Sequence, residues 1–259
     1  MYVYDLNPIL LQLGPLEIRW YGLVYVLGFL LAAWWLERAR KQGKIALSQN
    51  DVWDFFFYLM VSMLAGARLF MVFWEPQIYL YNPLNLLKIW EGGMSFHGAF
   101  VGMVIAGWWL CRAKKLDFWK LADVISVPAM FALALGRIAN FVNGELVGRV
   151  WNGRWCVVFP EYGDACRHPS QIYAAVKRFL VLGWLVWLSN RKEFTPGFIF
   201  WNFVFFEGLG RIIVDFFRED PLYFGFSLGQ WFSLAMVIVA LWFFWKRHQE
   251  DWKKLIKKS

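Results

Sequence analysis

Residues that commonly hold metal ions are scarce in this sequence. It contains three cysteines and three histidines among 259 residues, and no Cys–Cys or His–His spacing is typical of a metal site. We therefore expect no metal ion and no other cofactor. Cys156 and Cys166 share one polar segment between apolar runs, where they either close a short disulfide in an oxidising compartment or remain two free thiols.

Charged residues are also few, at 18% of the chain, against 59% hydrophobic and 21% aromatic residues. A chain of this composition cannot bury its apolar surface within one water-facing shell, so lipid is the expected solvent. The net charge of +8 would suit a nucleic-acid partner, but the basic residues are spread between apolar runs. We therefore expect no nucleic-acid partner.

Seven predominantly apolar stretches are each long enough to cross a hydrocarbon core, which takes roughly 20 helical residues. They lie at 18–36, 51–74, 93–111, 119–142, 170–189, 196–216 and 227–245. The predicted fold is an all-α integral membrane protein, a bundle of about seven transmembrane helices in a single domain over 1–259, with a short basic tail from about residue 246. No basic region precedes the first stretch, so we expect it to be kept as an anchor.

Basic residues concentrate in alternate connections between these stretches. The rich set comprises Arg38, Arg40, Lys41, Lys44, Arg112, Lys114, Lys115, Lys120, Arg191, Lys192, Lys246, Arg247, Lys253, Lys254, Lys257 and Lys258. The opposite set comprises Arg19, Lys88, Arg149, Arg154, Arg167 and Arg218. Because Lys and Arg are retained on the cytoplasmic side, this pattern predicts an external N-terminus and a cytoplasmic C-terminus.

Ionisable residues within the stretches need partners or functions, because each costs roughly 2.5–3.5 kcal/mol at the bilayer centre. Asp54 and Arg68 lie at opposite ends of the second stretch, and we interpret Arg68 as paired with another helix. The third stretch contains SFHGAFVGMVIAG, in which Gly98, Gly102 and Ala106 form a small-residue stripe that lets a neighbouring helix approach closely. His97 is the third residue of this segment and is either a hydrogen-bonded structural group or a proton acceptor at neutral pH.

Four charged residues recur in the sixth stretch, WNFVFFEGLGRIIVDFFRED. Glu207, Arg211, Asp215 and Arg218 follow one another at steps of four, four and three, which predicts one narrow helical face. They form either a structural ladder of ion pairs or a site whose two arginines offer forked donors to a phosphate or carboxylate.

The segment GRIANFVNGE ends the fourth stretch. Arg137, Asn140 and Gly144 fall on one helical face, and Asn143 with Gly144 forms a strong turn signal. Together with Glu145, these polar groups stand where the helix leaves the membrane. Irregular backbone at that depth is tolerated only inside protein or beside a cavity. We therefore expect a polar pocket that opens toward the outer leaflet.

The longer segment GRIANFVNGELVGR closely resembles the signature of the prolipoprotein diacylglyceryl transferase family of membrane enzymes. RWYG, SFHG, RHPSQIY and GRIIVDFFRED resemble other blocks of that family, in the same order. The resemblance implies an enzyme of the cytoplasmic (inner) membrane whose active site faces the outer leaflet. It would transfer the diacylglyceryl group of phosphatidylglycerol, or a related phospholipid, to the lipobox cysteine of a prolipoprotein and release glycerol phosphate. The alternatives are a transporter or channel for an anionic or lipid-like substrate, and a noncatalytic scaffold.

The resemblance also implies roles for residues at matching positions. Arg137, Arg211, His97 and Tyr21 are the expected catalytic residues. His97 either takes the proton of the substrate thiol or hydrogen-bonds the lipid head group. The expected substrate-binding residues are Asn140, Asn143, Glu145, Gly148, Glu207, Asp215, Arg218, His168 and Gln171.

This chain departs from the family pattern at several positions. Glu207 replaces a tyrosine, Asp215 replaces a glutamate, and Ala174 stands where a glutamate is expected. Lys177 and Arg178 add charge to the fifth stretch. These differences concern head-group binding and leave the identity of the lipid donor open.

Overall fold

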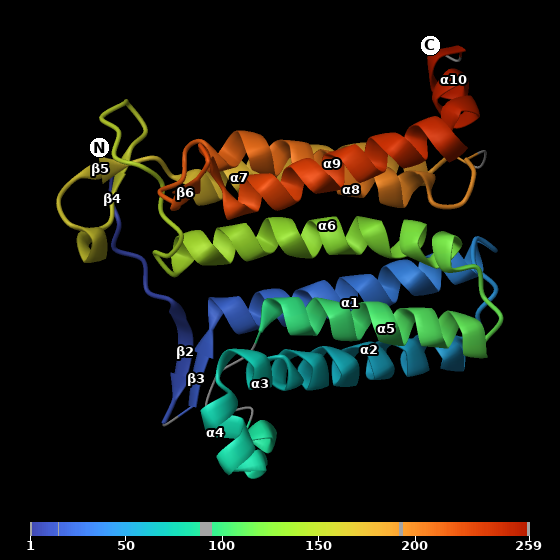
Figure 1. Ribbon diagram of the computed structural model, residues 1–259, viewed down its shortest axis with the longest axis horizontal. Helices are drawn as coiled ribbons and strands as arrows, with labels where there is room; N and C mark the ends of the chain where they lie inside the picture. The colour runs from blue at the N-terminus through green and yellow to red at the C-terminus, as the bar shows by residue number, and fades with distance from the viewer. Residues whose placement is uncertain (1, 15, 89–94, 192–193, 258–259) are drawn as a thin grey trace. The chain divides into compact units, whose positions relative to one another are not determined.

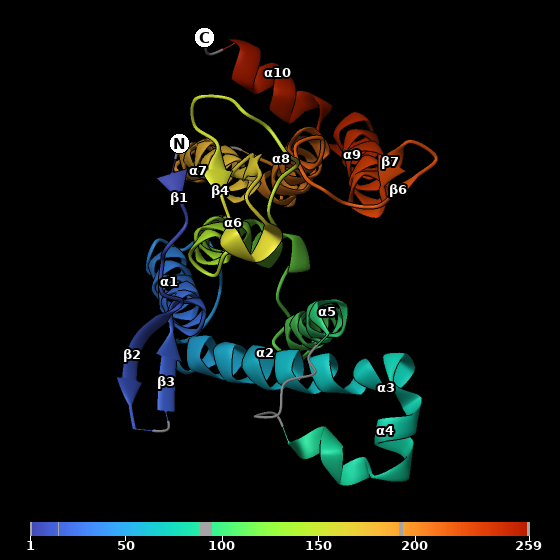
Figure 2. The same cartoon turned by 90° about the vertical axis from the view of Figure 1, so that its left-hand side faces the viewer.

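The structure is a computed structural model that describes residues 2–14, 16–88, 95–191 and 194–257 (Figures 1 and 2). The chain is mostly helical. It divides into two compact units: unit 1 comprises Met1–Ala32 with Ala122–Ser259, and unit 2 comprises Ala33–Leu121. The helix α1 (Trp20–Lys41) starts in unit 1 and α6 (Phe118–Val142) ends there.

Unit 1 is built on a group of apolar helices. α7 (Ser170–Ser189), α8 (Phe198–Asp215) and α9 (Leu228–Arg247) lie together, with α6 alongside them (Figures 1 and 2). Trp201 of α8 stacks on Phe243 of α9, with ring centroids 3.9 Å apart. Gly208 lets α8 approach closely, because a Cβ there would lie 3.0 Å from the Ser233 carbonyl oxygen. α10 (Gln249–Lys257) follows α9.

Short strands occur in the connections of unit 1, so the predicted all-α class holds for the apolar stretches only. β4 (Val157–Val158) pairs with β1 (Tyr2–Val3) and β5 (Cys166–Arg167), and η3 (Pro160–Tyr162) lies between β4 and β5. Cys156 and Cys166 form a disulfide, which selects one of the two alternatives that the sequence left open. Two hairpins add β2 (Ile9–Leu13) with β3 (Leu16–Arg19), and β6 (Leu222–Tyr223) with β7 (Phe226–Ser227).

Unit 2 is a helical pair with a short helical connection. α2 (Gln49–Leu69) packs on α5 (Phe96–Ala113), and α3 (Met71–Trp74), α4 (Pro76–Tyr81) and η1 (Pro83–Leu87) lie between them in sequence. A Cβ on Gly66 would lie 3.1 Å from Gly102 Cα, and a Cβ on Gly98 would lie 3.0 Å from the Gly66 carbonyl carbon and closer still to its oxygen. The predicted small-residue stripe is therefore confirmed at Gly98 and Gly102 as the contact with α2.

All seven predicted apolar stretches fall on helices. The helices that are long and apolar enough to cross a membrane are Trp20–Lys41, Gln49–Phe73, Phe118–Val142, Ser170–Ser189 and Leu228–Arg247. α5 is apolar over the shorter segment Gly98–Ala113, and α8 carries three charged residues. The chain is thus a multi-pass membrane protein, and membrane crossing by α5 and α8 stays a prediction.

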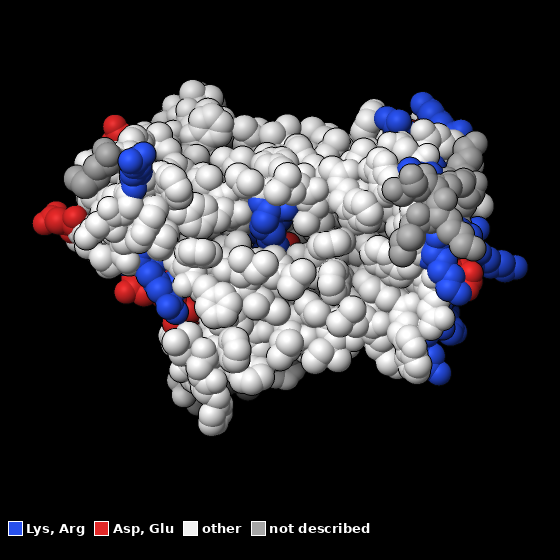
Figure 3. Space-filling model, turned by 90° about the horizontal axis from the view of Figure 1, so that it is seen from above, with Lys and Arg blue, Asp and Glu red and all other residues white. Residues whose placement is uncertain are grey.

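Charges are distributed unevenly over the face of unit 1 formed by α7, α8 and α9. Figure 3 shows lysine and arginine gathered toward the end where α9 meets α10, and a mostly uncharged middle that contains a small charged group. The basic residues of that end include Lys246, Arg247, Lys253 and Lys254. An uncharged band between polar ends is the surface that a helix bundle presents to a bilayer.

Candidate active site

A cationic pocket lies within unit 1 among α6, α7 and α8. Its described lining comprises Arg137, Leu146, Ser170, Gln171, Ala174, Lys177, Arg178, Arg211, Val214, Asp215 and Arg218. Five of these side chains are cations, and among the described lining residues one is a carboxylate. Cations gathered at membrane depth are costly without an anionic partner. The lining therefore indicates an anion-binding site.

Arg137 comes from the last turns of α6 and is held by the residues that follow it. Its Nη1 donates to Asn140 Oδ1 at 3.5 Å, and Asn140 Nδ2 donates to Glu145 Oε1 at 2.7 Å. Asn143 Nδ2 donates to the same carboxylate oxygen at 3.3 Å, and Gln171 Nε2 donates to the Glu145 carbonyl at 2.7 Å. Arg137 and Gln171 line the described pocket. Asn140, Asn143 and Glu145 are not among its described lining residues and lie behind Arg137.

The end of α6 follows from local backbone chemistry. Gly144 has a φ of 68°, a left-handed conformation that glycine adopts readily, and its N–H donates to the Phe141 carbonyl at 3.0 Å. The Tyr4 hydroxyl donates to the Val142 carbonyl at 2.6 Å, satisfying one of the last helical carbonyls. The predicted turn at Asn143 and Gly144 is confirmed, and it brings Glu145 back toward Asn140.

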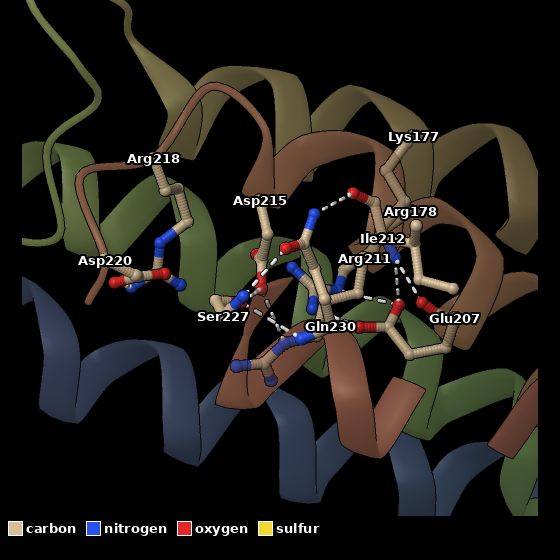
Figure 4. Close-up of polar contacts among 10 residues, drawn as sticks. All are labelled: Lys177, Arg178, Glu207, Arg211, Ile212, Asp215, Arg218, Asp220, Ser227 and Gln230. Carbon is tan, nitrogen blue, oxygen red and sulfur yellow. Dashed lines mark hydrogen bonds and ion pairs between the residues drawn. The ribbon is translucent and has the colours of Figure 1, made fainter. Parts of the chain in front are cut away.

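Glu207 joins α8 to α7 across the site (Figure 4). Arg178 donates to its carboxylate through Nε, at 3.1 Å, and through Nη2. Lys177 Nζ contacts the same carboxylate and donates to the Glu207 carbonyl at 3.2 Å. Gly210 makes room for the lysine stem, since a Cβ there would lie 2.7 Å from Lys177 Cδ. Glu207 thus serves two cations of α7, where the ladder interpretation had it neutralising Arg211 on its own helix.

Arg211 and Asp215 form an ion pair one turn apart on α8, with Nε and Oδ2 separated by 3.5 Å. Asp215 Oδ2 also accepts from the Ser227 hydroxyl at 3.2 Å. Ser227 caps α9, because its Oγ accepts from Gln230 N at 3.0 Å. A Cβ on Gly229 would lie 2.8 Å from Arg211 Nη2. The start of α9 is therefore shaped to fit the Arg211 and Asp215 side chains (Figure 4).

Arg218 does not continue the helical face predicted for the sixth stretch. α8 ends at Asp215, and Arg218 instead forms an isolated antiparallel bridge with Gly148. Its Nη2 donates to Asp220 Oδ1 at 3.0 Å. A Cβ on Gly148 would lie 2.7 Å from the Phe217 carbonyl oxygen. Spacing alone predicted the helical face wrongly because it does not show where the helix terminates.

The remaining predicted residues are placed as follows. His168 stacks on Trp151 with ring centroids 4.3 Å apart, and its Nδ1 lies 3.2 Å from the Tyr173 hydroxyl. Burial lowers the pKa of His168 below its usual value of 6.5. Tyr21 lies in the first turn of α1, and the described pocket lining includes neither it nor His168. His97 belongs to the first turn of α5, and its side chain lies outside the described part of the structure.

Sequence reasoning did not assign Lys177 and Arg178 to the site. A signal was present, because Ser170, Gln171, Ala174, Lys177 and Arg178 all line the pocket at positions that recur along one face of α7. The polar and small residues of that face, in an otherwise apolar helix, indicate a cavity.

The amino-acid sequence is similar to known proteins over nearly its whole length. A family model described as prolipoprotein diacylglyceryl transferase matches residues 8–246. The phosphatidylglycerol–prolipoprotein diacylglyceryl transferase of Geobacter sulfurreducens is 43% identical, over 91% of this chain and 93% of the relative. Its namesake from Aeromonas hydrophila is 38% identical, over 95% and 93%. The one from Legionella pneumophila is 36% identical, over 94% and 98%.

Proposed function

The chain belongs to the prolipoprotein diacylglyceryl transferase family, and we propose that it transfers the diacylglyceryl group of phosphatidylglycerol, or a related phospholipid, to the lipobox cysteine of a prolipoprotein. The thiol sulfur attacks the glyceryl carbon that carries the phosphate oxygen. A carbon–sulfur thioether bond forms, the carbon–oxygen bond breaks, and glycerol phosphate leaves with the bonding electron pair. None of the relatives named above supports the transporter alternative.

The surplus of cations in the pocket is the observation that carries this proposal. A phosphodiester has one negative charge, and the departing phosphate monoester gains a second as the carbon–oxygen bond breaks. Five cations line the described pocket beside Asp215. Fixed guanidinium groups in a low-dielectric site stabilise charge that develops in the transition state. Arginine suits this task because it keeps its proton in such surroundings.

We assign the phosphate contacts first to Arg137 and Arg211, which line the pocket from α6 and α8. Asn140, Asn143 and Glu145 position Arg137 through the hydrogen bonds described above. The other expected substrate-binding residues retained in the proposal are Gly148, His168, Gln171, Glu207, Asp215 and Arg218. Of these, Gly148 acts by holding Arg218, with which it forms a backbone bridge.

His97 takes the proton of the substrate thiol in this proposal, and Tyr21 donates to the lipid head group. A general base contributes typically 10²–10⁴-fold to a rate. The variant His97→Asn is therefore expected to lower kcat while KM for the lipid stays nearly constant. Equal losses in rate and in lipid binding would exclude the general-base role and leave His97 as a head-group ligand.

The membrane arrangement is part of the same proposal. Residues 1–259 form one integral domain of seven spans in the cytoplasmic (inner) membrane, with the N-terminus outside, the C-terminus in the cytoplasm and the active site toward the outer leaflet. The distribution of basic residues supports this orientation. The disulfide between Cys156 and Cys166 also supports it, since such bonds persist in oxidising compartments.

The test uses purified protein, phosphatidylglycerol vesicles and a synthetic lipobox peptide. We expect release of glycerol phosphate together with a peptide whose mass has increased by one diacylglyceryl group. A peptide with serine in place of the lipobox cysteine is the matched control, because it lacks the nucleophile. Absence of both products with phosphatidylglycerol and with other phospholipid donors would refute the transferase assignment for this chain.

A further inference from the structure

Arg178 is the most buried arginine of the pocket. Its surface is only 3% exposed, yet it lines the same cavity as Arg137 and Arg211. Its Nη1 is buried and makes no hydrogen bond to any described residue. An unsatisfied buried donor on a charged group is costly, and native structures keep few of them. Arg178 therefore has a donor in need of an acceptor at the edge of an anion site.

Glu207 determines how this guanidinium is oriented. The carboxylate receives Nε and Nη2, which form one edge of the planar group. Such forked pairing fixes the plane of the guanidinium, and Nη1 lies on the other edge, turned away from the carboxylate. Lys177 contacts the same carboxylate. With two cations sharing one anion, the cluster retains a positive charge that Glu207 does not neutralise.

We propose that Arg178 is a further substrate-binding residue that donates through Nη1 to the phosphate group, and that Glu207 is its positioning residue. This inference rests on the proposed function and specifies the charge that its site prefers. Three described carboxylates oppose the five lining cations. Asp215 belongs to the lining, Glu207 pairs with the two cations of α7, and Asp220 pairs with Arg218. Glu145 stands behind Arg137, linked to it through Asn140. The described lining itself holds five cations beside one carboxylate, so a phosphate monoester dianion is attracted more strongly than a phosphodiester.

The experiment measures binding of labelled glycerol phosphate to the full-length protein in nanodiscs of phosphatidylcholine, which carries no net charge. Arg178→Gln is expected to weaken binding about tenfold to a hundredfold, the size expected for a hydrogen bond to a charged group. It should raise KM for phosphatidylglycerol by a smaller factor, because the lipid phosphate carries a single charge. Arg191→Gln is the control, because Arg191 lies just beyond the end of α7 and stacks on Trp187 of that helix. It should leave both values unchanged.

A double variant separates binding from mere neutralisation of Glu207. Arg178→Gln with Glu207→Gln removes one charge of each sign and leaves the net charge of the pocket unchanged. If Arg178 binds phosphate, the double variant still binds glycerol phosphate as weakly as Arg178→Gln. Glu207→Gln alone should weaken binding less, per folded molecule, because the guanidinium keeps its charge and loses its fixed orientation. Its thermal midpoint should fall, since Lys177 and Arg178 lose their shared carboxylate.

Recovery of wild-type affinity in the double variant would overturn the inference, as would a folded Arg178→Gln variant that binds normally. If Arg178→Gln does not fold, the double variant decides alone, because it removes the Arg178–Glu207 pair together and leaves Lys177 donating to the Glu207 backbone carbonyl. Lipid transfer by the wild type with normal binding in these variants refutes the role of Arg178 and preserves the proposed function. If the variants bind glycerol phosphate weakly but the wild type transfers no lipid, the role of Arg178 is kept and the proposed function is refuted.

Discussion

Two buried arginines of the membrane helices have opposite surroundings. Arg68 in unit 2 is 4% exposed, and its Nη groups donate to the Tyr79 hydroxyl at 3.2 Å, to the Asn85 carbonyl at 3.0 Å and to the Lys88 carbonyl. Arg178 in unit 1 is equally buried, pairs with a carboxylate and retains a donor beside a pocket. In a low-dielectric setting, acceptors that belong to the chain are sufficient for a structural arginine such as Arg68. Arg178 differs because it lines a pocket, where we propose that a phosphate accepts from its Nη1.

Substitution of the arginines that line the pocket should have the largest effect on lipid transfer. Arg137→Ala and Arg211→Ala are each expected to lower kcat/KM for lipid transfer about a hundredfold to a thousandfold, as loss of one donor to a developing oxyanion does elsewhere. The measurement is glycerol phosphate release, normalised to folded protein. Substitution of either arginine with no loss of rate would remove the distinction between the two regions.

Arg68→Met tests the structural side. Removing the guanidinium leaves two backbone carbonyls without these donors, and we expect the free energy of unfolding to fall by about 3 kcal/mol, at 1–3 kcal/mol for each unsatisfied group. Reversible denaturation in detergent measures that loss. Transfer activity per folded molecule should match the wild type, and a loss as deep as that of Arg137→Ala would place Arg68 among the functional arginines instead.

Gly148→Ala sharpens the comparison at the rim of the pocket. The new Cβ would lie 2.7 Å from the Phe217 carbonyl oxygen, so the bridge to Arg218 must shift, at a cost of about 1–3 kcal/mol for overpacking. We expect KM for the lipid to rise more than kcat falls. Gly183→Ala on α7 is the control, because a Cβ there meets nothing within 4 Å, and a similar rise in that variant would mean that Gly148 has no special part.

The smallest effect concerns a third buried cluster, at the junction of α9 and α10. His248 is fully buried, with Nδ1 2.9 Å from Asp251 Oδ2, and burial lowers its pKa below the usual 6.5. The unfolded chain therefore binds the proton first. His248 contributes stability above about pH 6.5 that is lost as the pH falls through the folded pKa. The thermal midpoint of the wild type should therefore fall between about pH 7.5 and about pH 5.5. In His248→Gln this fall should be smaller, and the difference should correspond to less than about 1 kcal/mol of unfolding free energy.

Much of the helical architecture was predictable because it depends on neighbours along the chain. Each predicted apolar stretch falls on a helix, and the turn at Asn143 and Gly144 forms where glycine accepts a positive φ. The stripe of Gly98 and Gly102 marks a close helix contact, because the absence of a Cβ has the same consequence in any fold. The motifs around Arg137 and Arg211 indicated the family, which the comparisons confirm.

The sequence by itself thus determined the helices, their lipid solvent and the class of reaction, since hydropathy, turn chemistry and motif order are properties of local segments. Only the tertiary structure decided which charges meet. Glu207 binds Lys177 and Arg178 on α7, Cys156 bonds to Cys166, and Arg218 leaves the helical face. The physical reason is that these pairings join groups remote in sequence, and their partners are chosen by helix ends and side-chain directions that spacing does not contain.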